Sequence, residues 1–192
     1  LILQILFNLQ GSTFVAGCSV AGKVTSLANL AIASLSSTMT VFSGQNLGAG
    51  NYRRLCRSAW LIPLSAGAIT LSAGILVTIF CNPLLALFTH DTAVLAFATR
   101  YIHIVLPFTW MYAIMNVIMC FANGIGEIKY PTIVNLFILW GVRIPVAYLL
   151  SRLGYGGYAM ASVPLSFLAG MILMLFYFRT KRWAKLCALA KN

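Results

Sequence analysis

Acidic side chains are almost absent from this chain: among 192 residues only Asp91 and Glu127 carry a carboxylate. Charged residues make up 8% of the sequence, whereas a soluble domain carries about 25%. So few charges cannot cover the surface of a soluble globule, and a disordered chain would need far more polar residues. The scarcity of acids also excludes most carboxylate-based catalysis. We therefore interpret the net charge of +11 against a membrane, and expect no nucleic-acid partner.

Apolar residues supply 61% of the chain and form long runs between the charged positions. Five runs without a charged residue exceed the roughly 20 residues that cross a hydrocarbon core, and a sixth is long enough if Arg143 is included. Because a backbone in lipid must satisfy its own hydrogen bonds, and the alternation typical of a membrane barrel is missing, these runs are predicted to be helices. They are residues 1–22, 24–52, 58–90, 101–126 and 153–178, with 130–151 as the sixth.

The first run allows two interpretations, because residues 8–12 form a polar, turn-like cluster. In one, residues 1–7 end a helix and a long helix covers about 13–47, which gives five full spans and the end of a sixth. In the alternative, 1–22 is a complete span and a separate one begins at Thr25. The chain begins with Leu, and we expect it to be a piece of a longer protein.

Basic residues are distributed unevenly between the two predicted sides. Nine of the 13 lie in 53–57, at Lys129 and after residue 178, whereas Arg100 and Arg152 lie on the other side. The excess of Lys and Arg in cytoplasmic loops predicts that the loops near 48–57 and 124–131, and a basic tail at 180–192, are cytoplasmic. We expect a protein integral to the cell (plasma or inner) membrane, with the lipid bilayer as a partner.

Neither metal chemistry nor catalysis is indicated by the remaining residues. The five cysteines and two histidines have no partner at metal-ligand spacing, so we expect no metal, no disulfide framework and no cofactor. No convergent nucleophile and base are evident, and an enzyme is not expected. Polar groups inside spans are functional candidates, of which Arg143 is the strongest. Pro145 beside it either shapes its helix or lets it bend.

Methionines recur every four residues at 111, 115 and 119, among aromatic and amide neighbours. Such a stripe is typical of plain packing, or it lines an adaptable cavity, since Met and aromatic rings adjust to varied ligands. The cavity interpretation selects Trp110, Tyr112, Met115, Asn116 and Met119 as the substrate-facing residues.

Residues 44–54 read Gly-Gln-Asn-Leu-Gly-Ala-Gly-Asn-Tyr-Arg-Arg after a long apolar run. Physically this is a helix end, where Gly44 and Gly48 let a neighbouring helix approach and residues 48–50 let the chain turn through positive φ. The motif resembles a hallmark of the multidrug and toxic compound extrusion (MATE) family. Residues 140–148, Trp-Gly-Val-Arg-Ile-Pro-Val-Ala-Tyr, are close to that family's pattern for its eleventh helix. The residues carrying these motifs include Gly44, Gln45, Asn46, Gly48, Gly50, Arg143 and Pro145.

The resemblance extends over essentially the whole chain, since residues 16–23, 82–89 and 123–127 follow in the family's order. It departs from the pattern at Asn123, where many members have Arg. It implies an all-α fold of two six-helix bundles around a cavity that opens to either side alternately. Residues 1–192 would form the second, C-terminal bundle, with most of its first helix absent and the N-terminal bundle as its partner.

Members of the family export organic cations and other amphipathic compounds in exchange for Na⁺ or H⁺. Some branches carry an acid early in the tenth helix, but residues 110–112 here contain none. The resemblance therefore implies that the ion-coupling carboxylate lies in the absent bundle. A lipid-linked oligosaccharide flippase of the same superfamily is the alternative, and Arg143 and Lys23 are its only candidate cavity cations.

Overall fold

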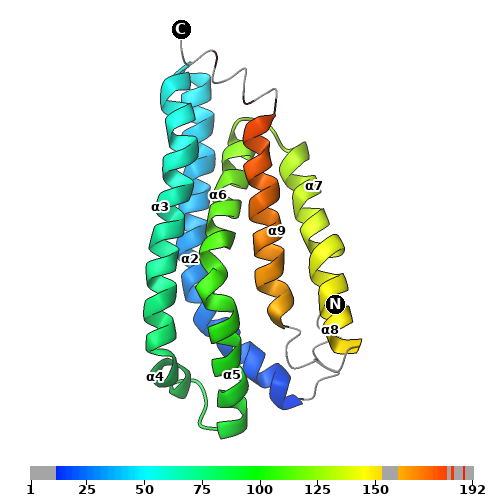
Figure 1. Ribbon diagram of the computed structural model, residues 1–192. Coiled ribbons are helices and arrows are strands. Elements are labelled where there is room, and N and C mark those ends of the chain that lie inside the picture. The colour runs from blue at the N-terminus through cyan, green and yellow to red at the C-terminus, as the bar shows by residue number, and fades with distance from the viewer. Residues whose placement is uncertain (1–11, 153–159, 181–182, 184–187, 189–192) are drawn as a thin grey trace.

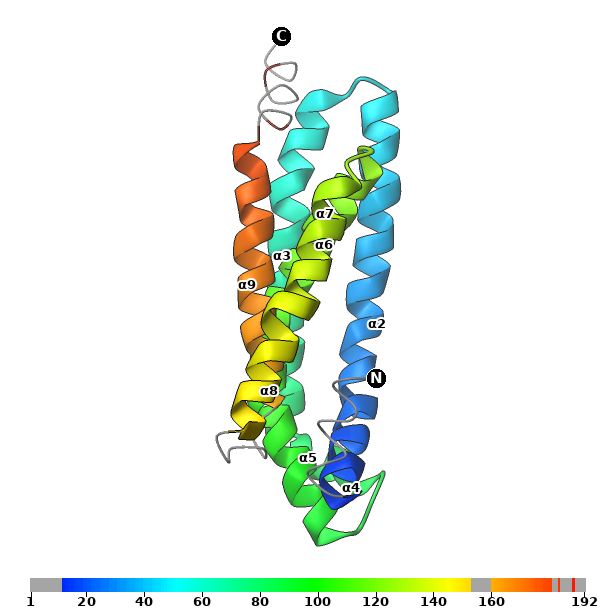
Figure 2. The ribbon, with the colours of Figure 1, turned by 90° about the vertical axis from the view of Figure 1, so that its right-hand side faces the viewer.

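The computed structural model describes residues 12–152, 160–180, 183 and 188, and their regular structure is helical throughout. The helices form one elongated bundle, with most of them running along its long axis (Figures 1 and 2). The longer elements are α2 (Ser12–Gly48), α3 (Tyr52–Ile79), α5 (Thr92–Val105), α6 (Thr109–Gly124), α7 (Lys129–Phe137), α8 (Ile144–Arg152) and α9 (Ser162–Phe176). The shorter ones are α4 (Cys81–Ala86), η1 (Leu106–Phe108), η2 (Ile138–Arg143) and η4 (Tyr177–Arg179).

Membrane-spanning length confirms the predicted fold class. Four helical stretches are long and apolar enough to cross a bilayer, and the two halves of α2 make a fifth if they count as one bent span. The four are Tyr52–Ile79, Thr92–Gly124, Lys129–Leu150 and Ser162–Arg179. The chain is thus an all-α integral membrane bundle. The predicted sixth-span end at residues 1–7 lies outside the described residues.

The long first helix is found nearly where the sequence places it, at Ser12–Gly48. It runs without a break through Gly22–Thr25, so the alternative start of a separate span at Thr25 is wrong. The helix bends instead by 43° between Ser12–Leu27 and Asn29–Gly48. Just before the bend, Thr25 donates to the Gly22 carbonyl oxygen at 3.0 Å and Ser26 to that of Lys23 at 2.7 Å. Side-chain hydrogen bonds of this kind compete with the helix ladder and favour bending.

Proline positions coincide with two irregular turns. Pro107 lies in η1, a 3₁₀ turn that separates α5 from α6. Pro145 follows the π-helical turn η2. Proline has no N–H for the carbonyl four residues earlier, here Gly141, and its ring crowds that carbonyl, so the regular hydrogen bonding of the helix is interrupted there. Pro63, by contrast, lies buried inside an unbroken α3.

Helix α6 lies at the centre of the bundle. It packs against α2, α3 and α9, and its buried side chains supply much of the main apolar core, including Val117, Ile118 and Phe121. A second, smaller core lies around α5 and α4, with Ile102 and Leu85 fully buried. The buried side chains of α6 are therefore enclosed by three neighbouring helices.

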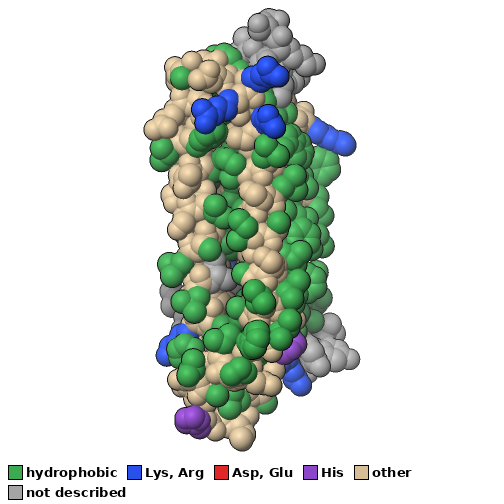
Figure 3. Space-filling model, turned by 90° about the vertical axis from the view of Figure 1, so that its left-hand side faces the viewer, with side chains coloured by type: hydrophobic (Ala, Val, Ile, Leu, Met, Phe, Trp, Pro, Cys, Tyr) green, Lys and Arg blue, Asp and Glu red, His purple; other side chains and the backbone are tan. Residues whose placement is uncertain are grey.

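Basic residues lie at both ends of the bundle. Arg53, Arg54 and Arg57 are exposed at the start of α3, and Lys129 and Arg179 are exposed at the same end. Figure 3 shows Lys and Arg gathered toward the ends of the face formed by α2 and α3, with hydrophobic side chains along the length between. This distribution is that of a bilayer-spanning bundle, in which the charged ends contact the headgroups.

Candidate functional site

A polar network lies on the face of α6 that contacts α2. Tyr112, Asn116 and Cys120 are spaced four residues apart and share this face. Ser36 of α2, 4% exposed, donates to Asn116 Oδ1 at 2.7 Å. Asn116 Nδ2 donates to the Tyr112 hydroxyl oxygen at 3.3 Å, and Cys120 Sγ lies 3.9 Å from Asn116 Oδ1. Asn116 is thus the centre of a network within membrane-spanning helices, where polar side chains are costly unless they bond or function.

Arg143 reaches the bundle interior from the π-helical turn η2. Its Nε donates to Ser166 Oγ of α9 at 3.2 Å, and its Cζ lies 5.8 Å from the centre of the Phe167 ring. Ser166 is fully buried and donates to the Val163 carbonyl oxygen at 2.6 Å. The Phe167 ring packs in turn against Tyr112, with centroids 5.0 Å apart. A continuous path of polar and aromatic contacts therefore links α2, α6, α9 and η2.

No acidic side chain takes part in these contacts. Asp91 caps the start of α5, where its Oδ1 accepts from the backbone N–H of Ala93 at 2.8 Å and of Val94 at 3.3 Å. Glu127 lies in the loop between α6 and α7. The described contacts of Arg143 are instead a serine hydroxyl and an aromatic ring. The described network thus contains a cation and hydrogen-bonding groups but no carboxylate.

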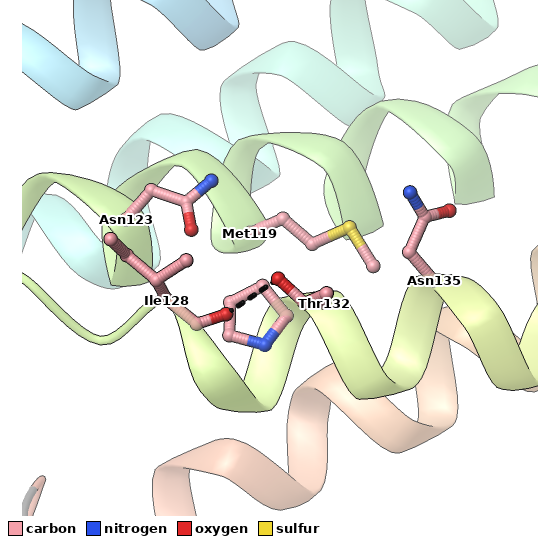
Figure 4. A pocket seen from close by; sticks show the side chains of 6 residues that line it. Met119, Asn123, Ile128, Thr132 and Asn135 are labelled. Atoms are coloured by element: carbon pink, nitrogen blue, oxygen red, sulfur yellow. Dashed lines mark hydrogen bonds between the residues drawn. The ribbon is translucent and has the colours of Figure 1, made fainter.

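A pocket of about 360 Å³ opens between α6 and α7. Figure 4 shows Met119 and Asn123 of α6 facing Thr132 and Asn135 of α7, with Ile128 at one end. Thr132 Oγ1 donates a hydrogen bond to the Ile128 carbonyl oxygen at 2.9 Å. Two side-chain amides and a thioether thus line a surface pocket that is separate from the Asn116 network.

The five residues predicted to share a cavity face different neighbours. Tyr112 and Asn116 meet in the network, whereas Met119 lines the α6–α7 pocket. Met115 is 4% exposed and packs so closely on Gly170 of α9 that a Cβ there would have no room. Trp110 packs, half-buried, against the main core. Their neighbours differ because several helices surround α6, and side chains on different faces of α6 contact different helices.

Four network members were not selected from the sequence: Ser36, Cys120, Ser166 and Phe167. The available signal was the abundance of Ser and Thr in α2, but most of these bond locally to a carbonyl one turn earlier, as Ser34 and Thr38 do. Ser36 differs because its hydroxyl donates to a side chain of α6, 80 positions away, and not to a carbonyl of its own helix. Which hydroxyl groups of α2 face α6 depends on tertiary packing.

The Gly-Gln-Asn motif forms the end of α2 and the turn into α3. Gly44 lies against Gly124, because a Cβ on Gly44 would be 3.3 Å from the Gly124 carbonyl oxygen. Gly50 adopts φ +71°, the left-handed conformation that glycine allows. Buried Asn46 donates from Nδ2 to the Phe42 carbonyl oxygen at 2.7 Å, while Gln45 is exposed. The close approach expected at Gly48 is wrong: α6 ends opposite Gly44, and no described atom lies within 4 Å of a Cβ at Gly48.

Cysteine and histidine side chains make ordinary structural contacts. Cys18, Cys56, Cys81 and Cys120 form no disulfide within the described part of the chain, while Cys187 lies outside the described residues. Burial raises the pKa of the Cys81 thiol, outweighing the opposing effect of a hydrogen bond with Thr99, so this group stays protonated. His103 Nδ1 lies 2.8 Å from the Thr99 carbonyl oxygen. Within the described part of the chain, no three potential metal ligands come together.

Comparison with known proteins places the chain in a family. A sequence model described as MatE matches residues 1–149. The chain is 28% identical over 149 residues to the probable multidrug resistance protein YoeA of Bacillus subtilis, covering 76% of this chain and 31% of that protein. It is 24% identical over 191 residues to the probable multidrug resistance protein NorM of Thermotoga maritima, covering 96% of this chain and 40% of that protein. It is 26% identical over 147 residues to the multidrug resistance protein PmpM of Pseudomonas aeruginosa, covering 77% of this chain and 31% of that protein.

The chain therefore spans only 31–40% of the length of these curated relatives. The family match covers well over half of the chain, including the Gly-Gln-Asn motif, the whole of α6 and Arg143. On these grounds the chain belongs to the MatE family, whose members are membrane transporters and not enzymes.

Proposed function

We propose that this bundle is the C-terminal half of a secondary antiporter that exports organic cations or other amphipathic compounds in exchange for Na⁺ or H⁺. Support comes from the family and from relatives that are named multidrug resistance proteins. The observation that carries the proposal is the Ser36–Asn116–Tyr112 network, which lies inside membrane-spanning helices and centres on the most enclosed one. Intramembrane polar groups of this kind mark transport pathways.

The proposed mechanism uses groups that suit varied amphipathic cations. The aromatic faces of Tyr112 and Phe167 attract a cation through their ring quadrupoles. Asn116 offers both a donor and an acceptor without fixing the partner's charge. The rings supply apolar contact and the amide supplies polar contact, so recognition does not depend on one ligand shape.

The conformational step would use the two irregular turns. In such transporters two bundles rock about a site near the membrane midplane, and each ligand shifts the population toward the state that it binds better. The 3₁₀ turn at Pro107 and the π turn before Pro145 lack the regular helical hydrogen bonds, so they are the points where the least is lost on bending. The ion-coupling carboxylate is proposed to lie in the N-terminal bundle, outside this chain.

The proposed orientation places the end bearing Arg53, Arg54, Arg57, Lys129 and Arg179 in the cytoplasm of the cell, together with the basic tail. Its support is the excess of basic residues at this end over the other, which carries Arg100 and Arg152.

Replacing Asn116 with Leu tests the function. The change removes the acceptor of Ser36 and the donor to Tyr112 while keeping the side chain's size. We expect efflux of a cationic dye from cells expressing the full-length protein to fall about 5- to 150-fold, since losing a hydrogen-bonding group that a ligand uses costs on the order of 1–3 kcal/mol. The measurement is the initial efflux rate divided by the amount of protein in the membrane.

Asn82→Leu is the matched control, because Asn82 is exposed in α4 and far along the sequence from the network. Its efflux rate should equal that of the unchanged protein. Full efflux by Asn116→Leu would refute the proposed role of the network. Flipping of a lipid-linked oligosaccharide in place of dye efflux would favour the alternative flippase function.

A further inference from the structure

A shallow groove of about 360 Å³ lies between α3 and the end of α9, apart from the network. Its lining consists of Trp60, Ile172, Leu175, Phe176 and Arg179. Trp60 is 46% exposed and stacks on Phe178, with centroids 4.3 Å apart. The groove therefore has an aromatic wall, an apolar floor and a single cation at its end.

The order of residues along α9 gives this groove a direction. Ile172, Leu175, Phe176 and Arg179 follow at helical spacing, so they form one stripe that runs from apolar side chains to a guanidinium group. Helix α3 repeats the arrangement: Arg57 precedes Trp60 by one turn, and exposed Leu61 and Leu64 follow. Because the Trp60–Phe178 stack joins the two elements, both cations lie at the same end of the groove.

Arg57 and Arg179 keep hydrogen-bond donors available for an anion. Arg179 places its Cζ 5.6 Å from the Phe176 ring, and neither Arg57 nor Arg179 donates a hydrogen bond to another described residue. Exposed Arg53 and Arg54 lie beside Arg57 and add to the positive field, and with Arg57 and Asn51 they line a second pocket of about 390 Å³. The one acid at this end, Glu127, lies in the α6–α7 loop.

We propose that this groove, named the α3–α9 groove, binds an anionic phospholipid. One acyl chain would lie along Ile172, Leu175 and Trp60, and the phosphate would contact Arg179 and Arg57. Charge complementarity favours this occupant, since basic groups at a membrane surface attract anionic headgroups and the exposed apolar lining suits an acyl chain. Tryptophan at the boundary is typical of an interface between lipid and water. The proposal does not depend on the transport function.

The test uses the full-length protein incorporated into vesicles of equal parts phosphatidylglycerol and phosphatidylcholine. Native mass spectrometry then measures the ratio of the two lipids that remain bound. The unchanged protein should retain phosphatidylglycerol preferentially. Arg57→Gln and Arg179→Gln should each reduce that preference about fivefold, and the double variant roughly 25-fold, as expected for one surface cation each. Trp60→Ala should reduce retention of both lipids, because it removes the aromatic wall.

Arg152→Gln is the matched control, since Arg152 is also an exposed arginine beside an aromatic ring but lies at the other end of the bundle. It should leave the lipid ratio unchanged. The proposal is overturned if the double variant keeps the full preference, if Arg152→Gln loses as much, or if Trp60→Ala retains both lipids normally. Thermal unfolding in detergent confirms that each variant is folded, which surface substitutions of this kind should not prevent.

Discussion

Arg143→Met should abolish most drug efflux by the full-length protein while leaving its thermal stability unchanged or higher. A cation within a membrane-spanning helix costs about 2.5–3.5 kcal/mol on insertion scales. Here the described contacts that offset this cost are neutral: one hydrogen bond to Ser166 and the Phe167 ring. Replacing a buried charge by an apolar side chain of similar length is often neutral or stabilising.

If Arg143 had a purely structural role, its replacement by Met would therefore reduce neither the stability nor the efflux rate by much. We expect the efflux rate per membrane-inserted molecule to fall at least about tenfold, as expected when an interaction worth on the order of 1.4 kcal/mol in the transport step is removed. Two measurements on the same sample separate the outcomes: efflux of a cationic dye from cells, and the unfolding midpoint of the purified protein. Normal efflux by Arg143→Met would remove Arg143 from the transport pathway.

Arg152→Met is the matched control for this prediction. Arg152 ends α8, the helix that follows Arg143, and places its Cζ 5.2 Å from the Tyr148 ring. Like Arg143, it is therefore an arginine with a ring beside its guanidinium group, although the ring is a different one. It is exposed at the bundle end, where a cation costs little. Its replacement should leave the efflux rate near that of the unchanged protein. If Arg152→Met lost as much efflux as Arg143→Met, the effect would come from removing any cation in this region and not from Arg143 itself.

The second large effect is expected from Gly124→Ala. A Cβ at Gly124 would collide with Ser43 Oγ and with the Thr40 carbonyl oxygen of α2. The serine side chain can rotate away, but the carbonyl belongs to a helix backbone, so α2 and α6 must separate. Overpacking of this kind costs about 1–3 kcal/mol. We expect the unfolding midpoint of the purified full-length protein to fall by roughly 1–4 °C, because the shift per kcal/mol decreases as a protein becomes larger.

The same separation should also reduce transport. Thr40 Oγ1 donates to the Cys120 carbonyl oxygen at 3.3 Å, and one turn further along the two helices Ser36 bonds Asn116 at 2.7 Å. Both bonds span the interface that Gly124→Ala forces apart. Gly48→Ala is the control, because a Cβ there meets no described atom and should leave the midpoint unchanged. Equal midpoints for the two alanine variants would contradict the close α2–α6 contact.

The elements that the sequence predicts well are those set by local chemistry. The long helix at 12–48 follows from an apolar run closed by a glycine-rich turn, and the break at Pro107 follows from the missing N–H of proline. Gly50 adopts the positive φ that its position in the turn suggests.

Long-range packing decides the features that the sequence leaves open. The spacing of Met115 and Met119 indicates a shared face, yet one packs on Gly170 and the other lines the α6–α7 pocket. Gly48 was expected to contact a helix that in fact ends one turn earlier. Asn116 was selected as a polar residue in a span, but its partner Ser36 could be identified only once α2 and α6 were placed side by side.

Coupled export by the full-length protein is the central claim, and reconstitution into liposomes tests it most directly. A fluorescent cationic dye is followed while a Na⁺ or H⁺ gradient is imposed across the membrane. The account predicts that one of the two gradients drives the dye against its own concentration gradient, and that dissipating the ion gradient stops this movement. Dye that moves only down its own gradient, at a rate unaffected by either ion, would contradict the account.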